Sequence, residues 1–239
     1  MSESDDSSGA FPPSASLHPA SVSPVAKLST GSRALDSLMG GGIPYGRLTE
    51  ISGESGTGKS QLLFTLAVNF PSNGGRLLFV DTGGTFRPER IHQISSLRNR
   101  EPEAVLANID VLGARSVDKV VSSVTSALAS GAYSAVMVDS LSDLFYGGSE
   151  LSRDTGRLSL FCRELAFNAL TGGTLIVVTN GVRYNPDTDT TSAQGFDHTA
   201  AYIHTRISLS RNGGRWLAID LETRSRAEFA IGPGGIVDF

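Results

Sequence analysis

The sequence predicts an α/β fold in which a mostly parallel sheet is flanked by helices and finishes in an antiparallel edge. Three observations support this prediction. Apolar β-prone segments alternate with helical patterns, a glycine-rich loop joins one such strand to a helix, and residues 205–239 hold short strands joined by glycine turns. Alternating strands and helices favour parallel pairing, whereas closely spaced strands favour hairpins. We expect one ordered domain over residues 26–239.

Residues 1–25, in contrast, are dominated by Ser, Pro and Ala. Prolines remove backbone donors and disfavour regular structure, so we expect a disordered tail here. Phe11 could anchor this tail in a pocket of a partner protein, and the alternative is a solvated tail with an incidental aromatic residue.

The glycine-rich loop is the most specific motif in the chain. Residues 53–60 read Gly-Glu-Ser-Gly-Thr-Gly-Lys-Ser and fit the pattern G-x-x-x-x-G-K-[ST] of a phosphate-binding loop. A β-prone segment at residues 48–52 and an apolar helical pattern at residues 61–68 supply the strand and helix that this motif requires. An ordinary glycine-rich turn is the alternative, and the context disfavours it. The sequence therefore predicts a site for a nucleoside triphosphate.

The residue types of the loop explain its chemistry. Glycines let successive backbone N–H groups converge on phosphate oxygens at a helix N-terminus. Lys59 would neutralise the β- and γ-phosphates and would serve catalysis if the triphosphate is hydrolysed, while the Ser60 hydroxyl would bind Mg²⁺. The remaining predicted contacts are Gly53, Glu54, Ser55, Gly56, Thr57 and Gly58.

Further strands and helices alternate along the chain. A short helix is expected before the loop at residues 32–39, and the expected strands after it are residues 76–82, 109–112, 135–140 and 174–179. Expected helices begin near Pro88 and cover residues 117–128 and 151–170. Residues 181–202 are rich in Gly, Asp, Thr and Asn, and we expect a long loop there. The antiparallel edge is expected at residues 205–209, 216–221 and 228–231.

The strand at residues 135–140 ends in an acidic residue, Asp139. An Asp at the carboxyl end of a parallel strand beside a phosphate loop can hold Mg²⁺ through a water molecule. An apolar run that ends in Asp is a weak signal alone, because many strands end this way before a turn. With the loop upstream, Asp139 is a predicted metal residue together with Ser60.

Composition excludes some classes of function. The chain has 239 residues with a formal charge of -4, so contact with nucleic acid would need a local basic patch. Its one cysteine, Cys162, excludes an intrachain disulfide and is typical of a reducing compartment. There is no apolar run long enough to cross a bilayer and no basic leader before Lys27. We expect an intracellular protein without a membrane partner.

Several motifs together resemble the RecA/RadA recombinase family. They are Leu28-Ser29-Thr30-Gly31 with Leu35-Asp36 and Gly40-Gly41-Gly42, Gly58-Lys59-Ser60-Gln61-Leu62, Asp81-Thr82 with Thr85-Phe86-Arg87-Pro88-Glu89-Arg90, Val138-Asp139-Ser140 and Val178-Thr179-Asn180. The resemblance covers residues 27–239, and the segment from Thr85 to Arg90 is specific to the archaeal and eukaryotic branch. It implies a RecA-type ATPase core that binds ATP. Since the family's helical N-terminal domain is missing, the chain is most similar to a core-only paralogue, such as archaeal RadB or a eukaryotic recombinase paralogue.

The resemblance also implies roles for single residues. Gln61 would contact the nucleotide, and the planar guanidinium of Arg90 would stack on adenine. Residues 145–154 would form the first DNA-facing loop and residues 181–199 the second. Their basic residues are Arg153, Arg157 and Arg183. So few cations imply weak, salt-sensitive binding of single-stranded DNA. Alternatively, these arginines only solvate the loops or pair with Glu150 and Asp154.

Two positions depart from the family pattern. Members that hydrolyse ATP quickly carry a Glu after Asp-Thr, where it orients the attacking water, and a Gln after Thr-Asn, which senses the γ-phosphate. Here these positions are Gly83 and Gly181. The resemblance therefore implies slow hydrolysis with nucleotide binding retained. Alternatively, a neighbouring acid, Asp81 or Asp143, takes the role of the base.

These observations support three hypotheses about function. The first is an ATP-binding recombinase paralogue that assists recombination and DNA repair, with weak hydrolysis, weak binding of single-stranded DNA and a recombinase or paralogue as its partner. A homo-oligomer is also compatible with it. The second is an active recombinase that forms filaments on DNA. The third is a KaiC-like regulatory ATPase that does not act on DNA. The first implies the nucleus in a eukaryote and the cytoplasm in an archaeon.

Overall fold

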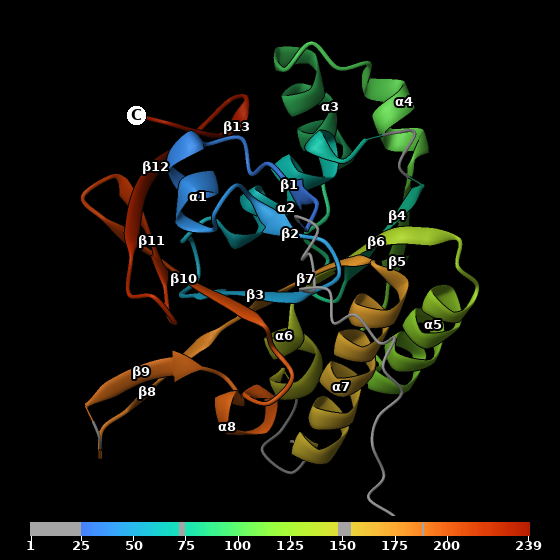
Figure 1. Ribbon diagram of the computed structural model, residues 1–239, viewed down its shortest axis with the longest axis vertical. Helices are drawn as coiled ribbons and strands as arrows, with labels where there is room; N and C mark the ends of the chain where they lie inside the picture. Colours follow the sequence, from blue (N-terminus) through green and yellow to red (C-terminus); the bar gives the residue numbers. More distant parts are fainter. Residues whose placement is uncertain (1–24, 72–74, 148–153, 188) are drawn as a thin grey trace, which may run out of the picture.

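A computed structural model describes residues 25–71, 75–147, 154–187 and 189–239 (Figure 1). The expected tail, with Phe11, lies outside these residues except for Val25. The predicted fold class is confirmed, because a large sheet with mostly parallel pairing is flanked by helices and carries antiparallel strands at its C-terminal edge. Within the described ranges, no helix combines the length and the apolar content needed to cross a bilayer.

The sheet has nine strands among the described residues. Neighbouring strands run parallel from β10 to β5 and antiparallel from β10 to β13. β3, which precedes the phosphate loop, lies between β10 and β7. In spatial order the strands are β13 (Gly235–Val237), β12 (Arg226–Gly232), β11 (Arg215–Asp220), β10 (Thr205–Asn212), β3 (Leu48–Gly53), β7 (Leu175–Asn180), β6 (Tyr133–Asp139), β4 (Arg76–Asp81) and β5 (Ile109–Gly113).

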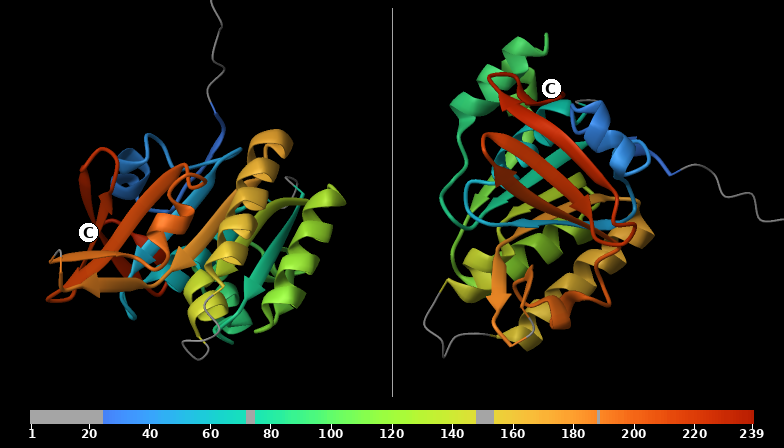
Figure 2. Two further views of the ribbon diagram at one scale, coloured as in Figure 1. Left: turned by 90° about the horizontal axis from the view of Figure 1, so that it is seen from below. Right: turned by 90° about the vertical axis from the view of Figure 1, so that its left-hand side faces the viewer.

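Two hydrophobic cores pack on the two faces of the sheet (Figure 1). Successive strand residues point to opposite faces, so in β4 Leu77 and Phe79 join one core while Leu78 and Val80 join the other. The first core lies under α1 (Arg33–Leu38), α2 (Lys59–Asn69), α3 (Pro88–Leu97) and α4 (Pro102–Ala107). The second lies under α5 (Val117–Ala129), α6 (Leu141–Tyr146) and α7 (Thr155–Gly172). Figure 2 shows the antiparallel strands at one side of the molecule, next to α1.

The expected loop over residues 181–202 is the main error of the sequence prediction. Most of this segment is a hairpin of β8 (Val182–Asn185) and β9 (Thr190–Ala193), followed by the short helix α8 (Phe196–Thr199). The hairpin projects from the body of the fold in Figures 1 and 2. Its strands are rich in Thr and polar residues and pair mainly with each other. They therefore lack the alternation of apolar residues by which a half-buried strand is recognised.

Smaller elements also differ from the prediction. The helices α4 and α6 and the two-stranded ladder of β1 (Lys27–Leu28) and β2 (Ile43–Pro44) were not predicted. α6 includes Phe145, whose side chain is buried in the second core. The expected DNA-facing loop over residues 145–154 therefore cannot begin at residue 145. Residues 148–153 of that loop lie outside the described residues.

Candidate nucleotide-binding site

A cavity of about 690 Å³ lies at the carboxyl edge of the sheet, where the phosphate loop follows β3. Its walls come from the loop, the ends of β6 and β7, the start of α6, and β11 and β12. We call it the loop cavity. It brings together most of the predicted nucleotide residues, namely Gly53, Glu54, Ser55, Gly56, Gly58, Lys59, Ser60 and Gln61, with Asp139. Thr57 is instead buried in the loop, where its hydroxyl donates to the Glu54 carbonyl at 2.8 Å.

Two loop positions require glycine. Gly58 has φ +96°, in the left-handed region, and a Cβ there would lie 2.5 Å from Cδ1 of Ile231. A Cβ at Gly53 would lie 2.4 Å from the carbonyl oxygen of Leu209 on β10. The left-handed backbone explains Gly58, and close packing of β10 against the loop explains Gly53. The loop lies directly at the N-terminus of α2.

Lys59, the first residue of α2, lies over the loop. Its Nζ donates to the carbonyl oxygens of Gly53 and Glu54 at 2.7 and 2.8 Å. The pKa of Lys59 is lowered, because the effect of burial is larger than the opposite effect of the carboxylates of Asp139, Asp143 and Glu54. The ammonium group therefore lies in a cavity with three carboxylates near it. The ammonium group could also pair with the oxygens of a polyphosphate bound in this cavity.

Ser60 and Asp139 line the same cavity and fit a magnesium site. Asp139 is held on both sides, since Thr179 Oγ1 donates to Oδ1 at 2.5 Å and Thr85 Oγ1 donates to Oδ2 at 3.2 Å. Within the described ranges, no group of three His, Cys, Asp or Glu side chains could hold a metal ion. Mg²⁺ usually binds through one or two protein oxygens together with water and phosphate. These two residues would hold Mg²⁺, which would neutralise phosphate charge when bound.

Arg90 lies on α3 beside the cavity wall. Its guanidinium donates to Gln61 Oε1 at 2.8 Å and to the carbonyl oxygens of Gly232 and Pro233, each at 2.7 Å. Gln61 lines the loop cavity, so Arg90 reaches the cavity through it. The contact of Arg90 with adenine stays a prediction.

The two acids proposed as substitutes for a base at Gly83 have different positions. The carboxylate of Asp81 accepts the backbone N–H groups of Gly84, Thr85 and Phe86 at 2.8, 2.9 and 3.0 Å, so it is committed to the turn after β4. Asp143 lines the loop cavity, and its Oδ2 lies 3.0 Å from the point that a Cβ at Gly83 would occupy. Of the two, only Asp143 lines the loop cavity.

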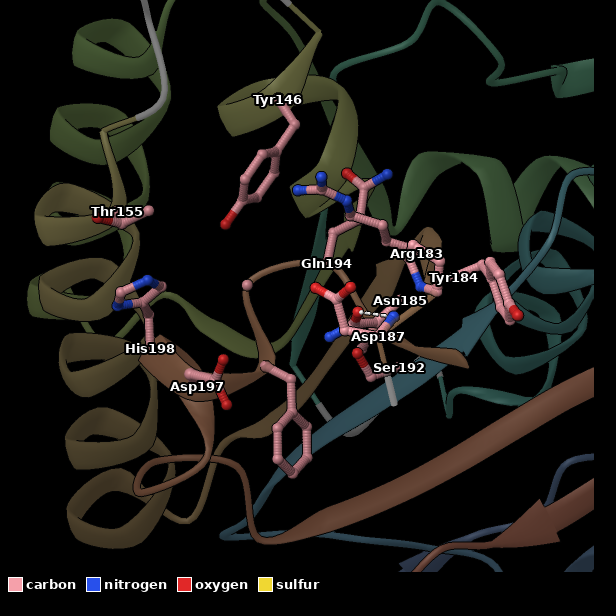
Figure 3. Close-up of a pocket in the computed structure, with 14 residues that line it drawn as sticks. Tyr146, Thr155, Arg183, Tyr184, Asn185, Asp187, Ser192, Gln194, Asp197 and His198 are labelled. Carbon is pink, nitrogen blue, oxygen red and sulfur yellow. Dashed lines mark hydrogen bonds between the residues drawn. The ribbon is translucent and has the colours of Figure 1, made fainter. Parts of the chain in front are cut away.

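The predicted DNA-binding arginines are spread over several elements. Arg153 lies outside the described residues. Arg157, on α7, forms an ion pair with Asp118 and another, at 3.6 Å, with Asp154, as one alternative expected. Arg183, on β8, is exposed and lines a second cavity of about 660 Å³ between the hairpin, α6 and α8, the hairpin cavity (Figure 3). Binding of DNA by these arginines stays a prediction.

A buried ion pair supports the strand that precedes the loop. The side chain of Glu50 on β3 is fully buried, and its Oε2 lies 3.3 Å from Arg206 Nε on β10. Asn180 at the end of β7 donates to Glu50 Oε1 at 2.9 Å, and the Arg206 guanidinium lies over the ring of Phe196. Burial raises the pKa of Glu50, whereas Asn180 and Arg206 lower it. This network connects the loop strand with the segment that follows the hairpin.

Comparison with known proteins identifies the family to which the chain belongs. The family model described as Rad51 matches residues 22–238. The chain belongs to the Rad51 family. The resemblance to RecA/RadA recombinases that the motifs indicated is thereby confirmed.

Rad51-family relatives come from both eukaryotes and archaea. "DNA repair protein RAD51" of Mycosarcoma maydis is 33% identical over 88% of this chain and 69% of its own length. "DNA repair and recombination protein RadA" of Metallosphaera sedula is 35% identical over 80% of this chain and 64% of its own length. "Meiotic recombination protein DMC1" of Saccharomyces cerevisiae is 33% identical over 90% of this chain and 72% of its own length. The chain thus spans about two thirds of the length of these relatives.

Two features of this Rad51-family site were missed from the sequence. Gln194, which follows β9, lines the loop cavity, and so does Trp216 on β11, the only tryptophan of the chain. Both are distant in sequence from the phosphate loop, and no local motif marks them. Pairing of β10 with β3 and of β8 with β9 brings them there, and the hairpin was not predicted.

Proposed function

We propose that this Rad51-family chain binds ATP with Mg²⁺ and acts as an accessory paralogue in homologous recombination and DNA repair. One observation carries the proposal. The loop cavity is lined by Lys59, Ser60 and Asp139, which would hold a triphosphate, and by Gly181. The other position that departs from the family pattern, Gly83, is also a glycine. Loss of one water-positioning group lowers a rate by about 10²- to 10⁴-fold, so hydrolysis would be slow while binding remains.

The accessory role requires a protein partner. We propose a recombinase or another paralogue, because relatives of this chain carry the names of repair and recombination proteins. Such a role places the protein with DNA, in the nucleus of a eukaryote or the cytoplasm of an archaeon. Affinity purification of the full chain followed by mass spectrometry would identify the partner, and it would also reveal self-association.

An active recombinase is the second candidate. Asp143 favours it, because this carboxylate lines the loop cavity next to Gly83 and could take over part of the missing function. Electron microscopy with single-stranded DNA and a non-hydrolysable ATP analogue separates the two candidates. Continuous helical filaments of this chain alone would favour the active recombinase. Membership of the Rad51 family disfavours the KaiC-like alternative.

Replacing Lys59 by Ala tests the proposed ATP binding. ATP with Mg²⁺ at 100 times its Kd should stabilise the wild-type chain by about 2.7 kcal/mol, which is roughly 5–10 °C in Tm for a domain of this size. Lys59→Ala should remove this rise, because its ammonium group faces the phosphates. The matched control is Lys119→Ala, which removes an exposed lysine from α5 and should keep the full rise. Absence of any rise in wild type would refute ATP binding.

Arg183→Ala tests the proposed weak binding of DNA. Arg183 is exposed on the hairpin, whereas Arg157 is held by two carboxylates. If Arg183 contacts one phosphate, its removal should reduce the slope of log K against log salt by about 0.7 for single-stranded DNA. Arg157→Ala should change the slope less. Fluorescence anisotropy of a labelled oligonucleotide measures the salt dependence of binding for both variants. An unchanged slope in Arg183→Ala would show that Arg183 does not contact the DNA.

A further inference from the structure

Gln194 lies between two cavities. It lines the loop cavity together with Lys59 and Asp143, and it lines the hairpin cavity together with Arg183 and Tyr146 (Figure 3). Among the described residues it is the one that lines both. A side chain in this position can contact a nucleotide on one side while its backbone belongs to the base of the hairpin.

The backbone of Gln194 is fixed beside the end of β7. Its N–H donates to the carbonyl oxygen of Gly181 at 2.9 Å, and its own carbonyl accepts from Asn180 Nδ2 at 2.9 Å. Pairing of Val182 with Ala193 in the hairpin ladder sets this position. These contacts do not use the side chain of Gln194, so its amide is available for another function.

The amide of Gln194 occupies the space next to the missing side chain. Its Nε2 lies 3.4 Å from the point that a Cβ at Gly181 would occupy. Its Oε1 is buried and has no hydrogen-bond partner among the described residues. A buried amide oxygen without a partner is unfavourable, which indicates that a hydrogen-bond donor such as an ordered water completes the site. An amide offers both a donor for a phosphate oxygen and an acceptor for a water molecule.

A chain of hydrogen bonds connects the same position to Asp143. Ser140 Oγ donates to Asp143 Oδ2 at 2.9 Å, the hydroxyls of Ser140 and Ser142 are 2.9 Å apart, and the N–H of Gly181 donates to Ser142 Oγ at 3.0 Å. Gly181 is therefore connected to Asp143 through these serines, and it also lies next to the amide of Gln194.

We propose that Gln194 supplies the phosphate-sensing amide that position 181 lacks, and that it couples the terminal phosphate of ATP to the hairpin of β8 and β9. This inference rests on the proposed binding of ATP. It implies that the chain distinguishes a triphosphate from a diphosphate, since the amide contacts only the terminal phosphate. It also implies that the triphosphate orders the hairpin.

Isothermal titration with ADP and with a non-hydrolysable ATP analogue tests the assignment. Gln194→Ala should weaken binding of the triphosphate roughly 10- to 100-fold, the usual effect of a hydrogen bond to a charged group, and should leave ADP binding unchanged within about twofold. Gln194→Glu keeps the size of the side chain but brings a negative charge to the phosphate, and it should weaken triphosphate binding at least as much. The control is Ser192→Ala, a hairpin residue that lines only the hairpin cavity and should alter neither affinity.

Hydrogen exchange gives a second readout that packing alone would not change. In wild type, amides of residues 182–185 and 190–193 should exchange more slowly with the triphosphate than with ADP, and Gln194→Ala should abolish this difference. If Gln194→Ala weakens binding of ADP and of the triphosphate equally, or weakens binding of neither, the assignment to Gln194 is overturned. If wild type binds neither nucleotide, the proposed function itself fails, and the inference fails with it.

Discussion

Asp143→Asn should remove most of the ATP hydrolysis that the wild-type chain retains. The Asp143 carboxylate lines the loop cavity, and its charge acts on Lys59. It is therefore the described acid best placed to orient the attacking water in the absence of a side chain at Gly83. The expected decrease in kcat is about 10²-fold or more, with ATP affinity changed only severalfold. Steady-state assays with single-stranded DNA present and absent measure both parameters.

A double-mutant cycle with Gly83→Glu gives this prediction its control. A Cβ at position 83 would lie 3.0 Å from Asp143 Oδ2, so a Glu there would be repelled by Asp143 in the wild-type background. In the Asp143→Asn background the repulsion is absent, and Gly83→Glu should restore turnover. Asp197→Asn, which removes an exposed acid on α8 that does not line the loop cavity, should change nothing. If Asp143→Asn leaves turnover unchanged, Asp143 does not take part in hydrolysis.

Arg206→Ala should destabilise the fold by about 3–5 kcal/mol, because it leaves the fully buried carboxylate of Glu50 without its cation. For a domain of this size such a loss is roughly 6–20 °C in Tm. Urea unfolding followed by circular dichroism measures it. The double variant Glu50→Gln with Arg206→Gln removes both charges and should be less destabilised than Arg206→Ala alone. A loss below about 1 kcal/mol in Arg206→Ala would show that the pair contributes little.

The same variant should be sensitive to pH. Burial raises the pKa of Glu50 in the folded chain above its unfolded value, and removal of Arg206 raises it further. A raised pKa favours folding at low pH, where Glu50 is protonated in both states, and this contribution is lost as pH rises through the folded pKa. The destabilisation of Arg206→Ala should therefore be smallest near the unfolded value of about 4.3 and should grow toward neutral pH.

The parts of the site that the sequence predicts are those encoded locally. The phosphate loop carries its glycines, Lys59 and Ser60 in one run, and Asp139 ends a clearly apolar strand. Both features can be recognised from adjacent residues alone. The fold class follows from the same alternation of strands and helices, since each buried parallel strand is a short apolar run.

The parts that the sequence does not predict depend on contacts between distant residues. Asp81 and Asp143 were equivalent as substitutes for a base, and three backbone N–H groups decide between them by holding Asp81. Gln194 reaches the cavity only because a hairpin of polar strands returns the chain to Gly181. Propensity and periodicity do not contain such information, because side-chain neighbours across a sheet are set by register.

The position of β3 in the sheet determines when the phosphate loop can form. Leu48 pairs with Ile176 on β7, and Thr49 pairs with Thr205 on β10, so both neighbours of this strand are made long after it during synthesis. Closing such long loops before any contact is gained slows folding. A nascent chain that ends before β10 lacks the backbone of Leu209 against which Gly53 packs. If the chain binds ATP as proposed, the nucleotide should stabilise the completed domain and should not stabilise a partly synthesised one.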